Sequence, residues 1–334
     1  MPPAPRAFLA RHPWAAFLWR WGVSLASLAL GLATLFVFRR GLPHVAWIAG
    51  YVLLAWLVFA ALALLRAALL ERGRHLVLHA GEYALQTLSH NLFLFVLPSD
   101  YASATLTSVN AVFLAGLAAG AIVTAVDPWY ARAVRPHPVV RAFLLALANF
   151  AALSVALPLI GVRPFWAMEG AALLAMLALA PAFAGGSWRR AALQAGVLAV
   201  CAALLAWYGR AAIPPAPLFV ARAVAARAVV DLDPVDPIDG SVPAEAVREW
   251  GQLAAYTAVY APGGLREEIA HAWSRDGVPI ARIRLSPVRG GRAEGFRTFS
   301  VTRNLGPKVD GHYRVDVVTA SGQLVGRLSF TVTP

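Results

Sequence analysis

The stretch VAWIAGYVLLAWLVFAALALL, residues 45–65, is an uncharged run of 21 residues. About 20 consecutive apolar residues are enough for an α-helix to cross the hydrocarbon core of a bilayer. The stretch therefore predicts a membrane-spanning helix, and it places the N-terminal part of the chain in a membrane.

Similar apolar segments lie on both sides of this stretch, separated by arginines and turn residues such as Arg39-Arg40-Gly41 and Asp127-Pro128. Residues 1–212 are therefore predicted to form an α-helical membrane bundle of about seven spans. The predicted spans are 17–38, 44–65, 76–98, 103–126, 142–162, 164–185 and 191–208.

The distribution of arginine predicts the orientation of these spans. With seven crossings, ten arginines fall on one side of the membrane and four on the other. The arginine-rich side of a membrane protein is usually cytoplasmic. The N-terminus is therefore expected in the cytoplasm and the C-terminal domain outside it. If the third segment, 76–98, does not cross, the count becomes seven against seven and the bias disappears.

The overall composition excludes some classes of function. The chain is 59% hydrophobic, and its net charge of +12 comes mostly from the predicted membrane half. The remainder is nearly neutral and has no basic stripe, so nucleic acid is not an expected partner. The single cysteine, Cys201, rules out an intrachain disulfide and a cysteine metal cluster. No catalytic, nucleotide-binding or cofactor-binding motif is present.

The third predicted span carries a stripe of polar residues, spaced so that they share one face of a helix. A charged group inside a membrane usually faces the interior of a bundle or water. Three interpretations remain open: a proton relay or ligand pocket, hydrogen bonding between helices, and an amphipathic helix lying on the membrane surface. A metal site lacks a second ligand pair and is not expected. The candidate membrane polar site is His79, Glu82, Gln86 and His90.

Residues 213–219 form a proline-rich linker, and residues 220–334 show the pattern of a soluble β domain. Turn pairs such as Asp276-Gly277, Asp310-Gly311 and Ser321-Gly322 predict hairpins. Residues 231–243 are dense in Asp and Pro and predict a loop. An immunoglobulin-like sandwich is the expected fold. The predicted strands are 220–230, 252–260, 267–275, 279–285, 296–301, 312–319 and 323–332.

The strand at 267–275 contains the candidate ligand face of the sandwich, His271 and Trp273. The spacing of two residues puts both side chains on the same face of the strand. One interpretation is a tryptophan that stacks on a ligand beside a hydrogen-bonding histidine. The alternative is a core tryptophan next to a histidine whose hydrogen bonds are satisfied inside the protein.

Several short motifs stand out in the C-terminal part, at 271–273, 295–300, 311–317 and 321–323, and others in the membrane part, at 11–14, 91–98 and 127–130. Through these motifs the C-terminal part resembles the bacterial domain of unknown function numbered 2914, and the membrane part resembles the bacterial family of unknown function numbered 5924. Phe296 and Tyr313 depart from the first pattern, which tends to have tryptophan at both positions. The resemblance implies a multi-span bacterial inner-membrane protein with an extracytoplasmic sandwich, and it implies no activity.

Three functions follow as expectations. The first is a membrane-anchored β domain that binds an envelope polymer, a peptide or a protein. The second is a small proton-coupled transporter or channel-like protein that uses the polar stripe. The third is an intramembrane lipid-linked transferase, for which Asp100, Asp127 and His137 are the available side chains. The lipid bilayer is a partner in each case, and a homo-oligomer stays open.

Overall fold

The computed structural model describes residues 45–184 and 187–334. The predicted span at 17–38 lies outside these residues. The chain divides into two compact units, and each is described by itself. The helical unit consists of residues 45–98, 115–153, 170–184 and 187–205, and the β unit consists of residues 99–114, 154–169 and 206–334.

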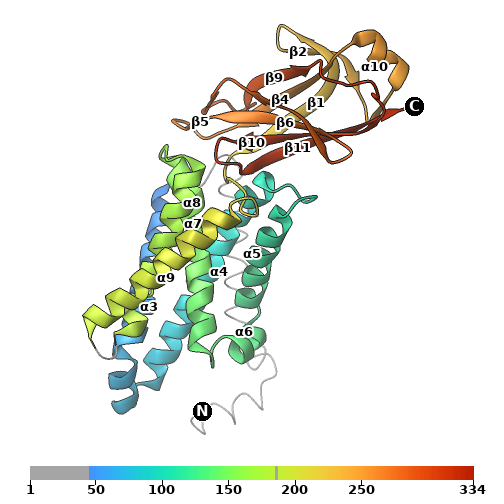
Figure 1. Ribbon diagram of the computed structural model, residues 1–334. Coiled ribbons are helices and arrows are strands. Elements are labelled where there is room, and N and C mark those ends of the chain that lie inside the picture. The colour runs from blue at the N-terminus through green and yellow to red at the C-terminus, as the bar shows by residue number, and fades with distance from the viewer. Residues whose placement is uncertain (1–44, 185–186) are drawn as a thin grey trace. The chain divides into compact units, whose positions relative to one another are not determined.

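The N-terminal part is helical throughout the described residues (Figure 1). Its helices follow the apolar segments of the sequence, and arginine, glycine and proline stand at most of the breaks between them. The helices are α3 (Val45–Glu71), α4 (His75–Ser103), α5 (Asn110–Ala125), α6 (Asp127–Ala133), α7 (Pro138–Leu159), α8 (Pro164–Leu177), the 3-10 turn η2 (Ala180–Phe183) and α9 (Trp188–Gly209).

Four of these helical segments are long and apolar enough to cross a membrane, and α5 with α6 would make a fifth if that pair, bent by 102°, forms one span. Helix α4 is not among them because its polar stripe interrupts the apolar sequence. The prediction of several helices that are long and apolar enough to span a membrane is thus confirmed for the described residues, and the number seven stays a prediction. The four segments are Ile48–Glu71, Pro138–Leu159, Pro164–Phe183 and Trp188–Gly209.

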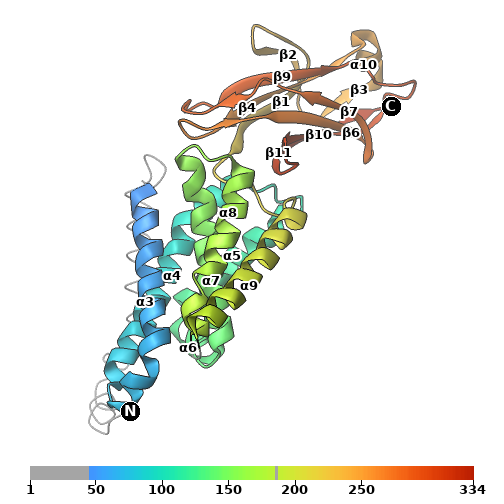
Figure 2. The ribbon, with the colours of Figure 1, turned by 60° about the vertical axis from the view of Figure 1, so that its left-hand side comes forward.

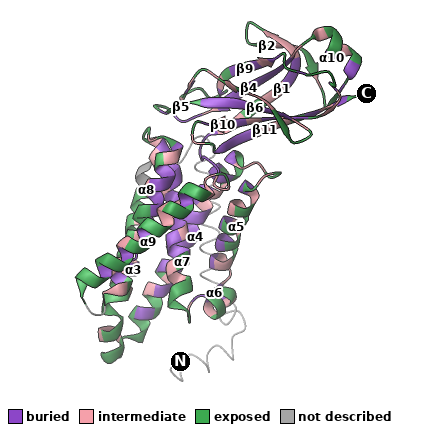
Figure 3. Cartoon of the chain, viewed as in Figure 1, coloured by how far each residue is buried: buried purple, intermediate pink, exposed green. Residues whose placement is uncertain are grey.

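Helix α4 is an interior helix of the helical unit. Most of its residues from Leu85 to Val96 are buried, as Figure 3 shows. In contrast, only 22% of the residues in the most apolar 18-residue stretch are buried in α3, and the same share is buried in α9. This burial argues against a helix that lies alone on a membrane surface. The apolar helices on the outside leave Glu82, Gln86 and His90 of the polar stripe buried in the helical unit, as expected for polar groups that avoid lipid.

The C-terminal domain of the β unit contains two larger sheets. Strand order is β2-β1-β4-β9 in the first and β3-β11-β10-β6-β7 in the second, with a small additional pair of β5 and β8. All-β architecture is therefore confirmed. The elements are β1 (Phe219–Val230), β2 (Asp233–Ile238), β3 (Ser241–Pro243), α10 (Ala244–Trp250), β4 (Leu253–Tyr260), β5 (Arg266–Glu267), β6 (Ile269–Arg275), β7 (Val278–Arg284), β8 (Val288–Arg289), β9 (Phe296–Thr302), β10 (Gly311–Thr319) and β11 (Leu324–Thr333).

The two larger sheets pack face to face around a shared core (Figure 2). One cluster of buried residues joins Leu253 and Ala255 from the first sheet with Trp273, Tyr313 and Val315 from the second. These residues come from the alternating positions of their strands, for which one face turns inward. The period of two in the sequence is thus the cause of the sandwich.

The prediction of a loop over residues 231–243 is wrong, because β2 and β3 lie in this segment. Asp231 and Leu232 adopt positive φ values of 50° and 63°, which makes the tight turn from β1 into β2. Strand β2 is at the edge of its sheet, so Pro234 and Pro237 need no hydrogen-bond partner on the outer side. Helix α10, directly after β3, was also not predicted.

Two of the three predicted hairpins are present. Asp276-Gly277 joins β6 to β7, and Ser321-Gly322 joins β10 to β11. The hairpin predicted at Asp310-Gly311 is wrong, because β9 and β10 belong to different sheets. A side chain on Gly311 would meet the Asp276 carboxylate, since a Cβ there would lie 2.5 Å from Oδ2. The glycine thus permits a close approach between two loops.

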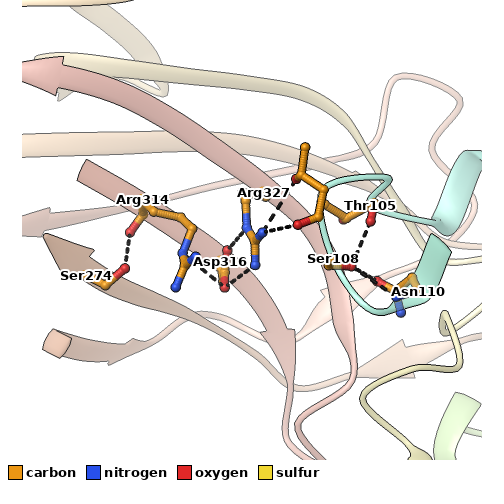
Figure 4. A network of polar contacts seen from close by, with 8 residues as sticks. Thr105, Ser108, Asn110, Ser274, Arg314, Asp316 and Arg327 are labelled. Atoms are coloured by element: carbon orange, nitrogen blue, oxygen red, sulfur yellow. Dashed lines mark hydrogen bonds and ion pairs between the residues drawn. The ribbon is translucent and has the colours of Figure 1, made fainter. Parts of the chain in front are cut away.

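An ion-pair network lies on β10 and β11 (Figure 4). Arg327 donates two hydrogen bonds to Asp316, of 2.6 and 3.0 Å, and a third of 3.1 Å to the carbonyl oxygen of Thr107. Arg314 lies 3.8 Å from the same carboxylate. The two-point contact between Arg327 and Asp316 fixes the register of β10 and β11 at this position.

Candidate functional site

The polar stripe of α4 divides into two parts. His79, in the first turns of α4, has a side chain that is 60% exposed, whereas the side chain of Glu82 is 8% exposed. Gln86 and His90 are buried. The first part of the stripe therefore reaches the surface of the helical unit, and the second part faces other helices.

Glu82 is the centre of a cluster of basic side chains. Its carboxylate oxygens lie 3.5 Å from Arg66 Nη1, 3.4 Å from Arg141 Nη1 and 3.8 Å from Arg135 Nε. The Nδ1 atom of His79 lies 3.8 Å away. Three guanidinium groups thus surround one carboxylate, and the cluster keeps an excess of positive charge whichever state His79 adopts.

The three arginines come from separate parts of the sequence. Arg66 lies in the second half of α3, Arg135 lies between α6 and α7, and Arg141 lies in the first turn of α7. Antiparallel neighbours bring the end of one helix beside the start of the next, which places all three at the same end of the helical unit. Sequence reasoning treated these arginines only as signs of orientation. Their convergence on Glu82 was missed, because pairing between distant segments leaves no local pattern.

A cavity of about 320 Å³ opens beside this cluster. Arg66, Arg135 and Arg141 form part of its wall, and apolar side chains form most of the rest. Its far wall includes Ala182 of η2. The indole nitrogen of Trp56, on α3, donates to the carbonyl oxygen of Ala178, just before η2, and so holds these two walls together. The apolar side chains of this wall include those of Phe59, Leu62 and Leu85.

The buried half of the stripe makes hydrogen bonds between helices. The Gln86 amide nitrogen donates to Asp127 Oδ1 at 2.7 Å and to the carbonyl oxygen of Thr124 at 3.0 Å. His90 Nδ1 lies 3.2 Å from the carbonyl oxygen of Ala121 and 3.3 Å from Thr124 Oγ1. These contacts join α4 to the bend between α5 and α6. They are the contacts expected of an interhelical polar network.

His271 and Trp273 lie in the core of the β sandwich. His271 has no exposed surface and Trp273 is 1% exposed. A side chain without accessible surface cannot stack on a ligand unless the sheets separate. Both side chains instead contact Ser300 of the opposite sheet: His271 Nδ1 lies 2.8 Å from Ser300 Oγ, and Trp273 Nε1 donates to it at 2.9 Å.

The imidazole of His271 also bridges to a second strand of the opposite sheet. Its Nε2 atom lies 3.0 Å from Thr257 Oγ1 on β4. A neutral imidazole with its proton on Nε2 satisfies both ring nitrogens, with the Ser300 hydroxyl donating to Nδ1. Burial lowers the pKa of His271 from 6.5 to about 4, because desolvation disfavours the imidazolium. His271 is therefore a neutral polar link between the two sheets.

The side chains considered for a transferase are divided between the two units of the chain. Asp127 accepts the hydrogen bond from Gln86, His137 is exposed, and Asp100 is buried within the residues of the β unit. Among residues 45–184 and 187–334, no group of three or more His, Cys, Asp or Glu is arranged to hold a metal ion.

Comparison with known families gives two matches. Residues 6–252 match the model of a family described as a family of unknown function, DUF5924. Residues 266–332 match the model of a protein of unknown function, DUF2914. The two matches occur in the order expected from the motifs. Neither a curated protein nor a solved structure matches the chain.

Proposed function

The chain belongs to the family of unknown function DUF5924, and from this premise we propose that it anchors an extracytoplasmic β domain to a bacterial inner membrane, as a binding or interaction module. The observation that carries the proposal is the combination of several apolar helices with a C-terminal sandwich that has a core of its own. The helices would hold the module at the membrane, and the module would bind an envelope polymer, a peptide or a protein.

The proposed orientation rests on seven crossings. The four apolar helical segments, the bent pair and α4 make six, and the predicted span at 17–38 makes the seventh. With seven crossings the arginine count of ten against four puts the N-terminus in the cytoplasm and the C-terminal domain outside it. Helix α4 would then cross as an interior helix, shielded from lipid by its neighbours.

The strand order supports an immunoglobulin-like sandwich. In that fold, strands A, B and E are neighbours in one sheet, and strands C, F and G in the other. Here β1, β4 and β9 are neighbours, and β6, β10 and β11 are neighbours. The additional strand β7 pairs with β6, as C′ pairs with C in variable-type domains. The order along the chain fits the same assignment.

Two side chains support the same assignment. Trp273 is buried on β6, the strand that corresponds to C, where immunoglobulin domains carry their core tryptophan. Tyr313 lies near the start of β10, the counterpart of F, and its hydroxyl donates to the carbonyl oxygen of Val309 at 2.8 Å. A tyrosine bonded to backbone just upstream is the tyrosine corner of these folds. His271 lies on the same strand as Trp273 and joins the two sheets through its contacts with Thr257 on β4 and Ser300 on β9.

Strand edges provide a means of binding. Among the described strands, β9 ends one sheet and β7 ends the other. An edge strand offers unpaired backbone groups to an extended peptide, which can add as a further strand. The proposal does not require the polar stripe of α4. The hydrogen bonds of Gln86 and His90 favour a structural role for the buried half of that stripe, so transport along it is not proposed as a second function.

Topology fusions test the proposed orientation. Alkaline phosphatase is active only outside the cytoplasm, and most fluorescent proteins mature only inside it. Each reporter is fused to Pro334 of the full chain and, as a matched control, after Ser187, between α8 and α9. We expect phosphatase activity without fluorescence at Pro334 and the reverse at Ser187. Fluorescence without phosphatase activity at Pro334 would refute the extracytoplasmic location.

A second experiment tests the module itself. Residues 213–334 are produced as a soluble fragment, and unfolding is followed by circular dichroism and by the fluorescence of Trp273 and Trp250. We expect one cooperative transition, because both buried clusters of the sandwich lie within these residues. A fragment that shows no cooperative unfolding would contradict an independent module.

A further inference from the structure

The cavity beside Glu82 has a wall that is charged on one part and apolar on the rest. Three guanidinium groups, those of Arg66, Arg135 and Arg141, line it together with apolar side chains such as Phe59 and Leu62. A wall of this composition matches a ligand that is itself anionic at one end and apolar at the other.

The guanidinium groups of these three arginines use few of their N–H donors in hydrogen bonds to the described residues. Each carries five N–H donors in a planar fork. Arg66 and Arg141 each donate one hydrogen bond to Glu82, at 3.5 and 3.4 Å. Charge-assisted hydrogen bonds are usually about 2.7–2.9 Å long, so these contacts are loose. The Nε atom of Arg135 is buried and makes no hydrogen bond to the described residues.

Charge balance points the same way. Within the part of the chain that the structure describes, the cluster combines three cations with one carboxylate, before any charge on His79. Buried or partly buried charges are costly unless they are paired. The side chains of Arg141 and Arg135 are only 14% and 24% exposed, so water compensates their charge only in part. An anion in the cavity would complete the pairing.

We propose that this cavity binds the phosphate group of an anionic lipid, with the phosphate between Arg66, Arg135 and Arg141 and the first part of the lipid chain along Phe59, Leu62 and Leu85. The site lies in the helical unit and does not depend on the proposed role of the β domain. A fixed guanidinium fork matches two phosphate oxygens at once, which makes arginine suited to this group.

The position of the arginines fits the level of lipid head groups. Arg66 lies five residues before the end of α3, and Arg141 lies in the first turn of α7. Both helices are long enough to span a bilayer, so residues near their ends lie close to the membrane–water interface. The cavity volume of about 320 Å³ is enough for a head group and adjoining methylene groups, and the remainder of a lipid would lie outside.

Glu82 has a specific part in this proposal. Its carboxylate holds the three guanidinium groups together while the cavity contains no anion, and it competes with the phosphate for their donors. Replacing it with glutamine removes one negative charge and leaves the arginines in place. The proposal therefore predicts that Glu82→Gln binds the anionic lipid more tightly than the natural chain does.

The test measures binding to the purified full chain in dodecyl maltoside. Calorimetric titration uses dihexanoyl-phosphatidylglycerol, which is anionic, dihexanoyl-phosphatidylcholine, which is zwitterionic, and inorganic phosphate. We expect saturable binding of the phosphatidylglycerol at one site. Arg135→Gln and Arg141→Gln should each weaken it roughly tenfold or more, through loss of charge-assisted hydrogen bonds. Glu82→Gln should strengthen it by a few-fold or more.

Arg132→Gln is the matched control. Arg132 is exposed in the last turn of α6 and does not line the cavity, but its replacement changes the net charge by the same amount. It should leave the affinity unchanged. Arg66→Gln provides a further variant of the site, because the side chain of Arg66 is 49% exposed and its loss should not impair folding.

Three results would overturn the proposal. If Arg132→Gln weakened binding of the phosphatidylglycerol as much as Arg135→Gln does, the lipid would be attracted by the overall positive charge of the protein and not by this cavity. Equal affinity for the two lipids would show that the phosphate charge is not recognised. Binding of inorganic phosphate as tight as that of the phosphatidylglycerol would show that the apolar wall contributes nothing, and would identify the free ion as the ligand.

Discussion

Glu82 Oε1 and Arg141 Nη1 lie 3.4 Å apart, although 59 residues separate them in the chain. The contact joins an interior helix, α4, to the first turn of α7. The side chain of Glu82 is 8% exposed and that of Arg141 is 14% exposed. Water therefore screens this pair less than it screens a pair on the surface. The pair therefore contributes to the stability of the helical unit, whereas in the proposed lipid site Arg141 binds the phosphate and Glu82 competes with it.

Arg141→Ala is expected to destabilise the helical unit by about 1 kcal/mol, because Glu82 loses its least exposed arginine partner but keeps Arg66 and Arg135. Thermal unfolding of the full chain in detergent, without added lipid, measures the effect. Arg132→Ala removes an exposed arginine of α6 and should change stability by at most about 0.5 kcal/mol. Equal unfolding midpoints for the two variants would contradict the role given to Arg141.

Gly120→Ala and Gly116→Ala should differ sharply, although both glycines lie in α5. A Cβ on Gly120 would lie 2.7 Å from Cζ of Phe93, whose ring is buried, whereas a Cβ on Gly116 meets nothing within 4 Å. Overpacking typically costs about 1–3 kcal/mol, and alanine in a helix gains up to about 1 kcal/mol over glycine. Thermal unfolding should therefore show a loss for Gly120→Ala and no loss for Gly116→Ala.

Ser300→Ala should destabilise the sandwich by about 1–3 kcal/mol, because it leaves the buried indole N–H of Trp273 and Nδ1 of His271 without this partner. Ser329→Ala, at an exposed position on β11, is the control and should be nearly neutral. Denaturant unfolding followed through tryptophan fluorescence measures both. A neutral Ser300→Ala would mean that a water molecule replaces the hydroxyl.

The sandwich should lose stability as the pH falls from about 6.5 to about 4. Burial lowers the pKa of His271 to about 4, so in this range the unfolded state takes up a proton that the folded state does not. By proton linkage the loss amounts to about 3 kcal/mol at the lower end. Hydrogen exchange of the β6 amides in the full chain, corrected for its intrinsic pH dependence, follows this loss. His271→Gln should remove that part of the pH dependence.

Glu267 should act in the opposite direction. Burial raises the pKa of Glu267 to about 7, an effect that Arg163 opposes and Glu268 adds to. The folded state therefore binds a proton that the unfolded state has lost, and its contribution to stability disappears as the pH rises from about 4.5 to about 7. Glu267→Gln should stabilise the sandwich at pH 8 by about 2–3 kcal/mol and have little effect at pH 4.

The exposed neighbour Glu268 supplies the control for this prediction. Glu268→Gln removes the same charge one residue away, without burial, and should shift the unfolding midpoint little at either pH. Thermal unfolding at pH 4 and pH 8 compares the three chains. An unchanged stability of Glu267→Gln at pH 8 would contradict the raised pKa.

The elements of the fold could be predicted where one physical signal decides them. The length of the apolar stretches predicted the helices at 45–65 and 191–208, because a helix needs about 20 apolar residues to cross the hydrocarbon core of a bilayer. Alternation with a period of two predicted most strands of the sandwich, since one face must be buried. The prediction failed at 231–243, where the edge position of β2 allows the prolines, and at Asp310-Gly311, where a turn leads from one sheet to the other. Both errors depend on the partner strand, which a local pattern does not contain.

The sequence by itself determined the class of each half: helices that can enter a membrane, and a sandwich built from alternating strands. It also determined the spacing of the polar stripe on α4. Only the tertiary structure decided that Arg66, Arg135 and Arg141 meet at Glu82 beside a cavity, and that His271 joins two sheets through Thr257 and Ser300. The physical reason is range: propensity, hydropathy and turn chemistry act within a few neighbouring residues, whereas a polar cluster depends on which distant surfaces pack together.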